Sequence, residues 1–131
     1  MNDADVDMAL KARIDQADLG GLPVIYPNNQ TKQAVPYVVV QVTFNEVKDD
    51  TIDGSKPIIP GFMIATVVTS EGIGPRDALT TAGLIKALFP MGYRISLADG
   101  IIEVKKQPSV LSGFPQGGAW RQPVKIIFEA G

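Results

Sequence analysis

The sequence predicts a single α+β domain over residues 1–131, in which a mostly antiparallel twisted sheet with a long β-hairpin packs against two amphipathic helices. Residues 3–19 and 75–89 repeat apolar side chains at three- and four-residue steps, the pattern of helices with one buried face. Residues 37–44 and 62–69 are rich in β-branched and aromatic residues, which favour strands. A chain of this length buries roughly two thirds of the surface that its unfolded form exposes, enough for one core.

The two helices have clear start and stop signals. Acidic residues crowd the first turn of 3–19, where the helix dipole favours them, and Gly20 and Gly21 end that helix. Pro75 suits the first position of the helix at 75–89, and Pro90 ends it. The expected buried stripes are Val6, Ala9, Leu10, Ile14 and Ala17 in the first helix, and Ala78, Ala82, Ile85, Leu88 and Phe89 in the second.

The first half of the predicted sheet consists of a short edge segment and two strands joined by a long connection. Residues 22–27 are bracketed by prolines, which suits a sheet edge. In 37–44 one face is expected to meet the core, and it carries Val38, Val40, Val42 and Phe44. The connection 47–60 between this strand and 62–69 is long and polar, so we expect a hairpin with a projecting tip.

The second half of the sheet begins with a tight hairpin. Asp99-Gly100 is a type I′ turn signal between strands at about 93–98 and 101–106. A turn there pairs Leu97 with Ile102 and Ile95 with Val104 on the apolar face, and pairs Ser96 with Glu103 and Arg94 with Lys105 on the polar face. Residues 107–122 are rich in Gly, Pro and Ser and predict a long loop, followed by a last strand at 123–128.

The composition excludes much of the usual catalytic chemistry. The chain has no histidine, which is the commonest general base, and no cysteine, which is a common nucleophile. These two residues are also the commonest ligands of transition metals. The Gly72-Ile73-Gly74 turn lacks the third glycine of a dinucleotide site, and the alternating carboxylates from Asp3 to Asp7 lack the glycine and glutamate of a calcium loop. We therefore expect no enzyme, no cofactor and no metal site.

The charge pattern also limits the partners. The net charge is −2, and the longest cluster of basic residues is Lys105-Lys106. Both observations argue against a protein that binds nucleic acid by neutralising its phosphates. No apolar run approaches the ~20 residues of a membrane span, and the acidic N-terminal segment is opposite in sign to a secretory signal. The expectation is no membrane association and a protein made in a cytoplasm.

Two groups of residues are candidates for contact with other molecules. The first is the tip of the long hairpin, which carries Glu46, Asp49, Asp50, Asp53 and Lys56 and is either a solvated loop or a functional one. The second lies in the 107–122 loop and comprises Phe114, Pro115, Trp120 and Arg121 as a candidate subunit interface. Its aromatic residues either fold back over the core or anchor a partner, and the sequence leaves both open.

Four segments together resemble the tail-terminator proteins of tailed bacteriophages. They are Leu22 to Asn28 (LPVIYPN), Pro36 to Val42 (PYVVVQV), the helix from Ala78 to Pro90, and Gly118 to Val124 (GAWRQPV) with the strand that follows. The order of helix, sheet, helix, hairpin, loop and strand is similar over nearly the full length. None of the segments is a catalytic signature.

The resemblance implies a structural virion protein. It implies a ring, usually of six copies, that caps the tail tube, stops its polymerisation and gives the head or neck a surface for attachment. The implied partners are other copies of the chain, the tail tube protein and a head-completion or neck protein, with DNA only in passage through the lumen. The alternatives are another phage ring protein of the neck or tail, a small carboxylate-based enzyme and a monomeric binding module.

Overall fold

The computed structural model describes residues 3–17, 19, 21–26, 35–45, 48–49, 57–73 and 75–131. Its helices are α1 (Asp3–Asp15) and α2 (Arg76–Leu88), with the short 3-10 helix η1 (Glu71–Ile73) before α2. Its strands are β1 (Val24–Ile25), β2 (Tyr37–Phe44), β3 (Lys48–Asp49), β4 (Pro57–Ser70), β5 (Arg94–Leu97), β6 (Gly100–Val104), β7 (Ser109–Val110), β8 (Phe114–Gln116) and β9 (Ala119–Ala130).

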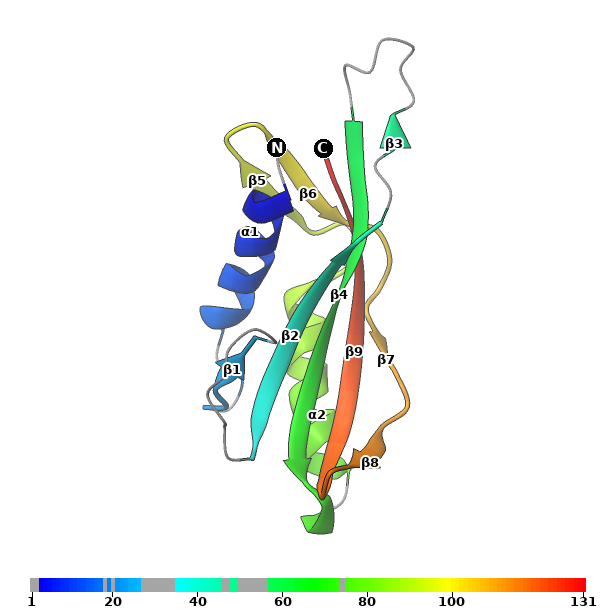
Figure 1. The fold of residues 1–131 in the computed structure, drawn as a ribbon. Coiled ribbons are helices and arrows are strands. Elements are labelled where there is room, and N and C mark those ends of the chain that lie inside the picture. Colours follow the sequence, from blue (N-terminus) through cyan, green and yellow to red (C-terminus); the bar gives the residue numbers. More distant parts are fainter. Residues whose placement is uncertain are drawn as a thin grey trace.

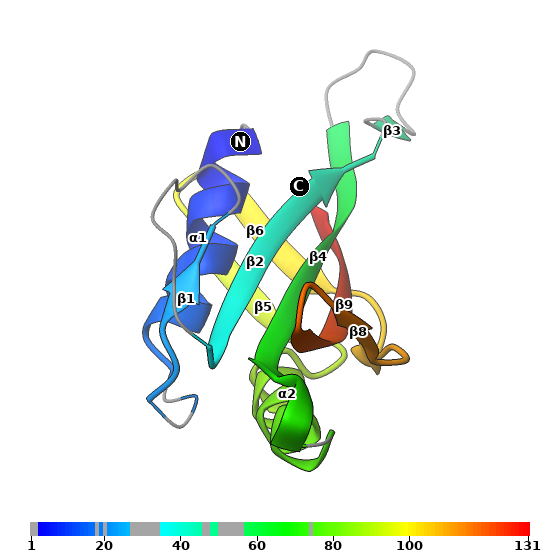
Figure 2. The same cartoon turned by 60° about the horizontal axis from the view of Figure 1, so that its bottom comes forward.

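The strands form a curled sheet in the order β1-β2-β4-β9-β6-β5. The β1–β2 pair is parallel and every other pair is antiparallel, while β3 pairs with β4, and β7 and β8 pair with β9. In Figure 1, α2 lies behind β4 and β9, and α1 lies beside the β5–β6 hairpin. Figure 2 shows the same curl from another side, with β5 and β6 behind β2. The expected fold class, α+β with a mostly antiparallel sheet, is confirmed.

The long central strands carry the core on their inner face. The alternate residues Val38 and Val40 of β2 are fully buried, as expected, and Met63, Ala65 and Val67 of β4 lie beside them in the core. On β9 the same face carries Val124, Ile126 and Phe128. The ring of Phe128 meets that of Phe44 edge to face at 6.1 Å, a favoured aromatic geometry.

Both helices bury most of their expected stripes against this inner face, while Ala9, Ala17 and Leu88 are half-buried. Val6, Leu10 and Ile14 of α1 are fully buried, as are Ala78, Ala82 and Ile85 of α2. α1 ends at Asp15 rather than at residue 19, because the carbonyl of Ile14 accepts a hydrogen bond from the amide of Ala17 three residues on, the tightening typical of a last turn.

Arg13 joins the two helices. Its Nε donates a 2.8 Å hydrogen bond to the carbonyl of Leu88, in the last turn of α2, where backbone carbonyls have no partner within the helix. Its guanidinium also lies 4.1 Å from the ring centroid of Tyr93. The cation therefore satisfies the negative end of α2 and fixes α1 against it.

The register of the β5–β6 hairpin differs from the expected one. Leu97 pairs with Gly100, and Ile95 pairs with Ile102. Gly100 lacks the positive φ that a type I′ turn at Asp99-Gly100 requires. The side chains nevertheless keep their expected faces, because a two-residue shift in pairing leaves a pleat of period two unchanged. The shift places Arg94 opposite Glu103, where the two charges form an ion pair.

The expected loop at 107–122 is wrong in a more informative way. Part of it pairs with β9 as two short edge strands, β7 and β8, and β9 itself begins at Ala119. Composition predicted a loop because glycine and proline punctuate strands. Short edge strands tolerate both residues, since a proline needs only to sit where no ladder hydrogen bond is required.

Candidate functional site

The β8–β9 hairpin separates the four residues expected at a subunit interface. Its turn is Gly117-Gly118, with φ of 61° and 78°, values that glycine adopts readily and other residues rarely do. Phe114 lies opposite Arg121 and Pro115 lies opposite Trp120. Because neighbouring residues of a strand point to opposite faces, Phe114 and Arg121 share one face of the sheet and Trp120 lies on the other.

Trp120 belongs to the inner face. Its side chain is half-buried and packs against the core cluster. Gly113 lies flat against it: a Cβ atom at Gly113 would stand 2.5 Å from Cζ2 of the indole. The Trp120 Nε1 donates to Oε1 of the buried Gln122 at 3.4 Å, and the Gln122 amide donates to the carbonyl of Leu111. Trp120 therefore holds the returning 111–113 segment onto β9.

Phe114 and Arg121 belong to the outer face. Phe114 is 43% exposed, a large fraction for an aromatic side chain in a strand. The Nε of Arg121 is buried and has no hydrogen-bond partner among the described residues. An exposed ring beside an arginine whose buried Nε has no partner among the described residues is a pattern typical of contact surfaces, which keeps Phe114 and Arg121 as interface candidates.

The outer face of the sheet is apolar over its centre. In Figure 1 it faces the viewer across β2, β4 and β9, and neither of the described helices α1 and α2 covers it. Its half-buried side chains include Val39, Phe62, Ile64 and Ile127. Lys125 lies above the Phe62 ring at 4.6 Å. Strand β4 is therefore apolar on both faces, which is typical of strands that are covered on both sides.

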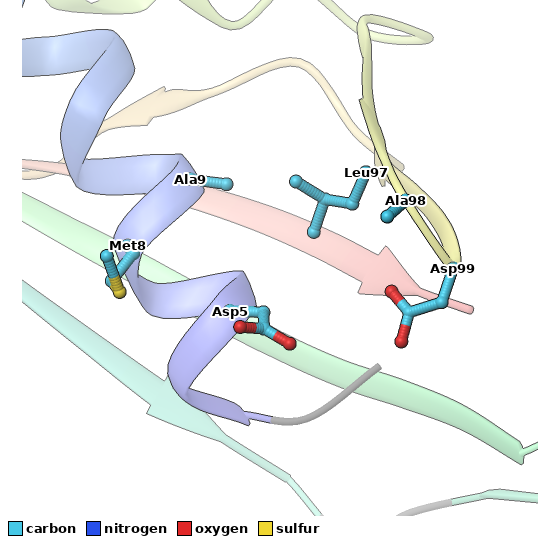
Figure 3. A pocket seen from close by; sticks show the side chains of 6 residues that line it. All are labelled: Asp5, Met8, Ala9, Leu97, Ala98 and Asp99. Atoms are coloured by element: carbon cyan, nitrogen blue, oxygen red, sulfur yellow. The ribbon is translucent and has the colours of Figure 1, made fainter.

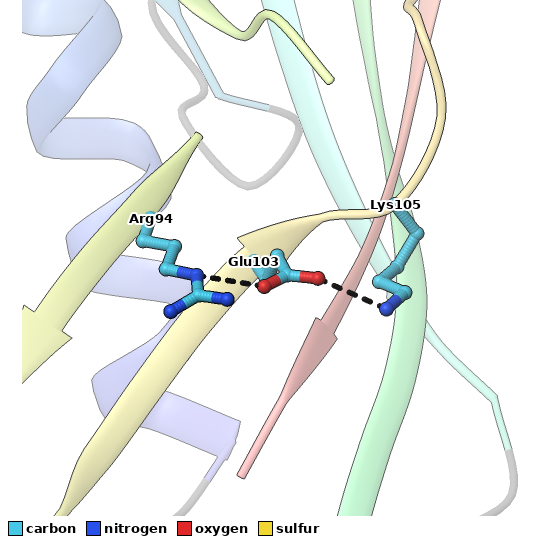
Figure 4. A network of polar contacts seen from close by, with 3 residues as sticks. All are labelled: Arg94, Glu103 and Lys105. Carbon is cyan, nitrogen blue, oxygen red and sulfur yellow. Dashed lines mark hydrogen bonds and ion pairs between the residues drawn. The ribbon is translucent and has the colours of Figure 1, made fainter. Parts of the chain in front are cut away.

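A charged network covers the outer face of the β5–β6 hairpin (Figure 4). Glu103 accepts hydrogen bonds from Lys105 Nζ at 2.9 Å and from Arg94 Nε at 2.8 Å. These hydrogen bonds, of which the one from Lys105 has the larger effect, hold the pKa of Glu103 below its usual range. Glu103 in turn raises the pKa of Lys105. Glu129 lies directly opposite Glu103 on β9, so the two cations also offset a like-charge pair.

A groove runs between α1 and β5. Its upper part is a pocket of about 400 Å³ lined by Met8 and Ala9 of α1 and by Leu97 and Ala98 of the hairpin, with the carboxylates of Asp5 and Asp99 on its two walls (Figure 3). Its lower part, of about 250 Å³, shares Ala9 and is lined by Ala12, Arg13, Gln16, Tyr93 and Ile95. We call this the α1–β5 groove.

The long hairpin tip is only partly described. Asp49 lies in β3, whose backbone pairs with the start of β4, and Glu46, Asp50, Asp53 and Lys56 lie outside the described residues. Strand β4 begins at Pro57, ahead of its first pair with β9 at Ile59, so this corner extends past the end of β9. The tip therefore remains a candidate on sequence grounds.

The described residues contain no group of three or more carboxylates that could hold a metal ion. Within the same residues, no helix is both long and apolar enough to cross a membrane. The features that stand out are surfaces, namely Phe114 with Arg121, the outer face of the sheet and the α1–β5 groove.

Several classes of protein present surfaces of this kind, and comparison with known families shows to which class the chain belongs. The model of a family described as phage tail terminator protein matches residues 5–128. The chain belongs to this family. It is a family of structural tail proteins, so the chain is a structural protein of the phage tail, and its place is the virion.

Solved structures share the terminator fold at low sequence identity. One protein, whose name states no function, is 20% identical with a TM-score of 0.82, over 100% of this chain and 96% of that chain. A second match is a chain from the virion of a native gene transfer agent particle, 15% identical with a TM-score of 0.64, over 94% of this chain and 90% of that chain. No curated protein sequence matches significantly.

Two features of the terminator went unnoticed in the sequence. Gly117-Gly118 is itself a two-residue hairpin signal, and using it as a turn would have placed Phe114 and Trp120 on opposite faces. Met8 interrupts the polar side of α1, and this one apolar residue was the available sign of the groove.

Proposed function

We propose that this terminator assembles on the head-proximal end of the tail tube as a ring of six copies, the number that the resemblance noted above implies. The ring ends tube polymerisation and presents the surface to which the head or neck attaches. Assembly takes place in the host cytoplasm, and DNA meets the ring only in passage through its lumen. The family match over residues 5–128 is the observation that carries this proposal.

The surfaces of the chain support self-association. A closed ring is built from head-to-tail contacts, so each copy needs two different surfaces. The outer face of β4 offers the half-buried side chains of Phe62 and Ile64, and the β8 edge offers the exposed ring of Phe114. Apolar patches of this kind mark contact sites, since a monomeric protein rarely leaves a large one exposed.

The hairpin tip has a place in the same proposal. Asp49, Asp50 and Asp53 either line the lumen, where their charge repels passing DNA, or dock on the tail tube. Charge reversal at the three positions distinguishes these roles. Raised DNA binding supports the lumen, whereas unchanged DNA binding with lost capping supports docking.

The test of the function uses tail tubes. Purified chain is added to tubes that are growing from tube protein, and negative-stain images record tube length and the ends. We expect a ring at one end of each tube and tubes that stop lengthening. Because the chain is expected to bind tubes even when it is monomeric alone, the tube experiment outranks a measurement of native mass.

Other outcomes identify the alternatives. Binding to heads and not to tubes indicates a head-completion protein, and growth of long tubes from the chain itself indicates a tube protein. A strict monomer that never joins tubes indicates a binding module. Hydrolysis of a substrate that depends on a pair of carboxylates would indicate an enzyme.

A further inference from the structure

The strand order of the sheet has two ends, and the backbone edges there differ. No other described strand lies beyond β1 at one end or beyond β5 at the other. β1 pairs with β2 only opposite Val38 and Val39, so the upper part of β2 is itself an edge. Among the described strands, β5 pairs only with β6. A free strand edge carries unpaired backbone groups, which a strand from another molecule can complete.

The hydrogen bonds of β6 show which backbone groups of β5 are free. The amide of Val104 in β6 donates to the carbonyl of Tyr93 at 2.9 Å. Because successive residues of a strand direct their backbone groups to opposite sides, every second residue from Tyr93 onward bonds to β6. Arg94 and Ser96 therefore turn their N–H and C=O groups to the free side. No described residue forms a hydrogen bond with these backbone groups.

The same alternation assigns the free backbone groups of β2. The amide of Asn45 bonds to β4, whereas the amide of Val38 donates to the carbonyl of Pro23 on the β1 side. The even-numbered residues of β2 therefore face away from β4. Beyond the end of β1 these residues are Val42 and Phe44, and their backbone groups have no hydrogen-bond partner within the described part of the chain.

The two edges also match in their side chains. Each carries two half-buried apolar residues that pack on the inner face against the core, namely Val42 and Phe44 on β2 and Ile95 and Leu97 on β5. The single charged residue within 41–44 and 94–97 is Arg94, which is already paired with Glu103. Joining the two edges thus covers apolar surface and buries no unpaired charge.

The directions of the free backbone groups select a parallel pairing of the two edges. In an antiparallel pair, residues that bond to each other lie directly opposite and share a face of the sheet. Val42 would then lie opposite a polar residue such as Ser96, with its apolar side chain on the outer side of β5. In a parallel pair, a bonding residue lies opposite one that bonds to the other side. Val42 then lies opposite Ile95, and Phe44 lies opposite Leu97, so the apolar faces are continuous.

We infer that the β5 edge of one copy pairs in parallel with the β2 edge of the next copy. The amides of Val42 and Phe44 donate to the carbonyls of Arg94 and Ser96 in the neighbouring copy. The amide of Ser96 in turn donates to the carbonyl of Val42. One copy cannot pair its own two edges, since β4, β9 and β6 separate them in the sheet.

The occupant is a second copy because this chain itself supplies the matching edge, with free backbone groups in the right alternation and an apolar inner face. Two different edges meet, so the contact repeats head to tail and closes as a ring. Closure leaves neither edge free to pair with other molecules. This inference rests on the proposed ring and specifies a contact that builds it.

The absence of cysteine makes the pairing testable by cross-linking. Thr43 and Ser96 lie opposite each other on the outer face in the proposed register, so Thr43→Cys/Ser96→Cys places one thiol on each edge. The cross-linker is a bis-maleimide that spans about 10 Å, or two strand spacings. Within one copy the two positions lie four strand spacings apart, roughly 19 Å along the sheet.

On tail tubes we expect this double variant to give a ladder of linked oligomers on a denaturing gel. Each single variant should give no ladder, because a head-to-tail contact never brings equal positions together. A mixture of the two single variants should stop at dimers, because each copy then carries one thiol.

A matched control uses the same Thr43→Cys change with Ser109→Cys. Ser109 is also an exposed serine of an edge strand, but it lies in β7 on the side of β9, so this pair should give no ladder. Circular dichroism of every variant checks that the fold is kept. Lysine cross-linking of the parent protein on tubes measures ring formation independently.

Hydrogen exchange tests the backbone bonds without any substitution. In the free chain, the amides of Val42, Phe44 and Ser96 should exchange fast, whereas the amide of Ile95, which bonds to β6, should exchange slowly. On tubes, exchange of the first three amides should slow by at least about tenfold, while Ile95 stays protected. Mass spectrometry with residue-level fragmentation after quenching measures the change.

The outcomes separate this inference from the proposed function. If lysine cross-linking traps rings but either the ladder of Thr43→Cys/Ser96→Cys or the slowed exchange is missing, the edge pairing is wrong and the ring stands. If the parent gives no linked rings on tubes, both fail. A ladder from Thr43→Cys/Ser109→Cys would place the β7 edge at the contact and would overturn the inference as well.

Discussion

Two hairpins flank opposite ends of β9, and their outer faces differ. On the β5–β6 hairpin, Arg94, Glu103 and Lys105 satisfy one another within the chain. On the β8–β9 hairpin, Phe114 is exposed and Arg121 has an unsatisfied Nε. Both hairpins bury their inner faces against the same core. The difference makes the outer face of the β8–β9 hairpin, and not that of the β5–β6 hairpin, the candidate for a contact with another molecule, because a buried polar group without a partner among the described residues lies there beside an exposed ring.

The largest expected effect is on the inner face of the β8–β9 hairpin. Trp120→Ala removes the indole that packs on the core and against Gly113, so we expect the free energy of unfolding to fall by about 3 kcal/mol. Urea denaturation measures the change. A loss below about 1 kcal/mol would mean that Trp120 is not a core residue and would return it to the interface candidates.

Phe114→Ala should act on assembly instead. The side chain is exposed in one copy, so we expect the free energy of unfolding to change by less than about 0.5 kcal/mol. Loss of an anchor at a subunit contact costs about 2 kcal/mol, or roughly thirtyfold in affinity. Titration of tubes with the variant measures the concentration needed for capping. Unchanged capping would remove Phe114 from the interface.

The two hairpin turns allow a smaller and sharper comparison. Gly118 has a φ of 78°, so Gly118→Ala should cost about 1 kcal/mol or more in the free energy of unfolding. Gly100 has no positive φ and is the first residue of β6, next to the Ala98-Asp99 turn of the other hairpin, so Gly100→Ala should cost distinctly less. Thermal unfolding of the two variants side by side checks the difference. Equal costs would favour the type I′ turn that the sequence predicts at Asp99-Gly100.

The smallest effect is expected from the charged network. The pKa of Glu103 is lowered in the folded chain, so its ionised form adds stability above its unfolded pKa, and this contribution is lost as the pH falls through the lower folded pKa. Glu103→Gln should therefore lower the melting temperature slightly at pH 7, and the difference from the parent should narrow as the pH falls from 7 toward 3. High salt should shrink the difference at pH 7. A difference that persists at pH 3 would point to packing instead.

Much of the fold follows from local periodicity. The stripe of Ala78, Ala82 and Ile85, and the alternation of Val38 and Val40, predicted the buried faces because helices and strands repeat at fixed periods. The pairing register of the β5–β6 hairpin could not be predicted from periodicity. A two-residue shift of Leu97 keeps the same faces, so the hydrophobic pattern cannot distinguish the two pairings.

The sequence offered Phe114 and Trp120 as candidate contact residues, but it did not predict how the two are arranged. Phe114 and Trp120 are alike in composition and context, and only the position of the Gly117-Gly118 turn assigns them to opposite faces. The α1–β5 groove depends on how α1 settles against a strand some 80 residues further along the chain, which local patterns do not encode. Long-range packing therefore accounts for most of what the sequence did not predict.

The pairing of β4 with β9 has a mechanical consequence. It runs without interruption from Ile59 opposite Ala130 to Ser70 opposite Ala119. At about 3.4 Å per residue, this ladder is a strut roughly 40 Å long. Load applied at the β3 corner is carried in shear by a continuous row of hydrogen bonds to the β8 edge.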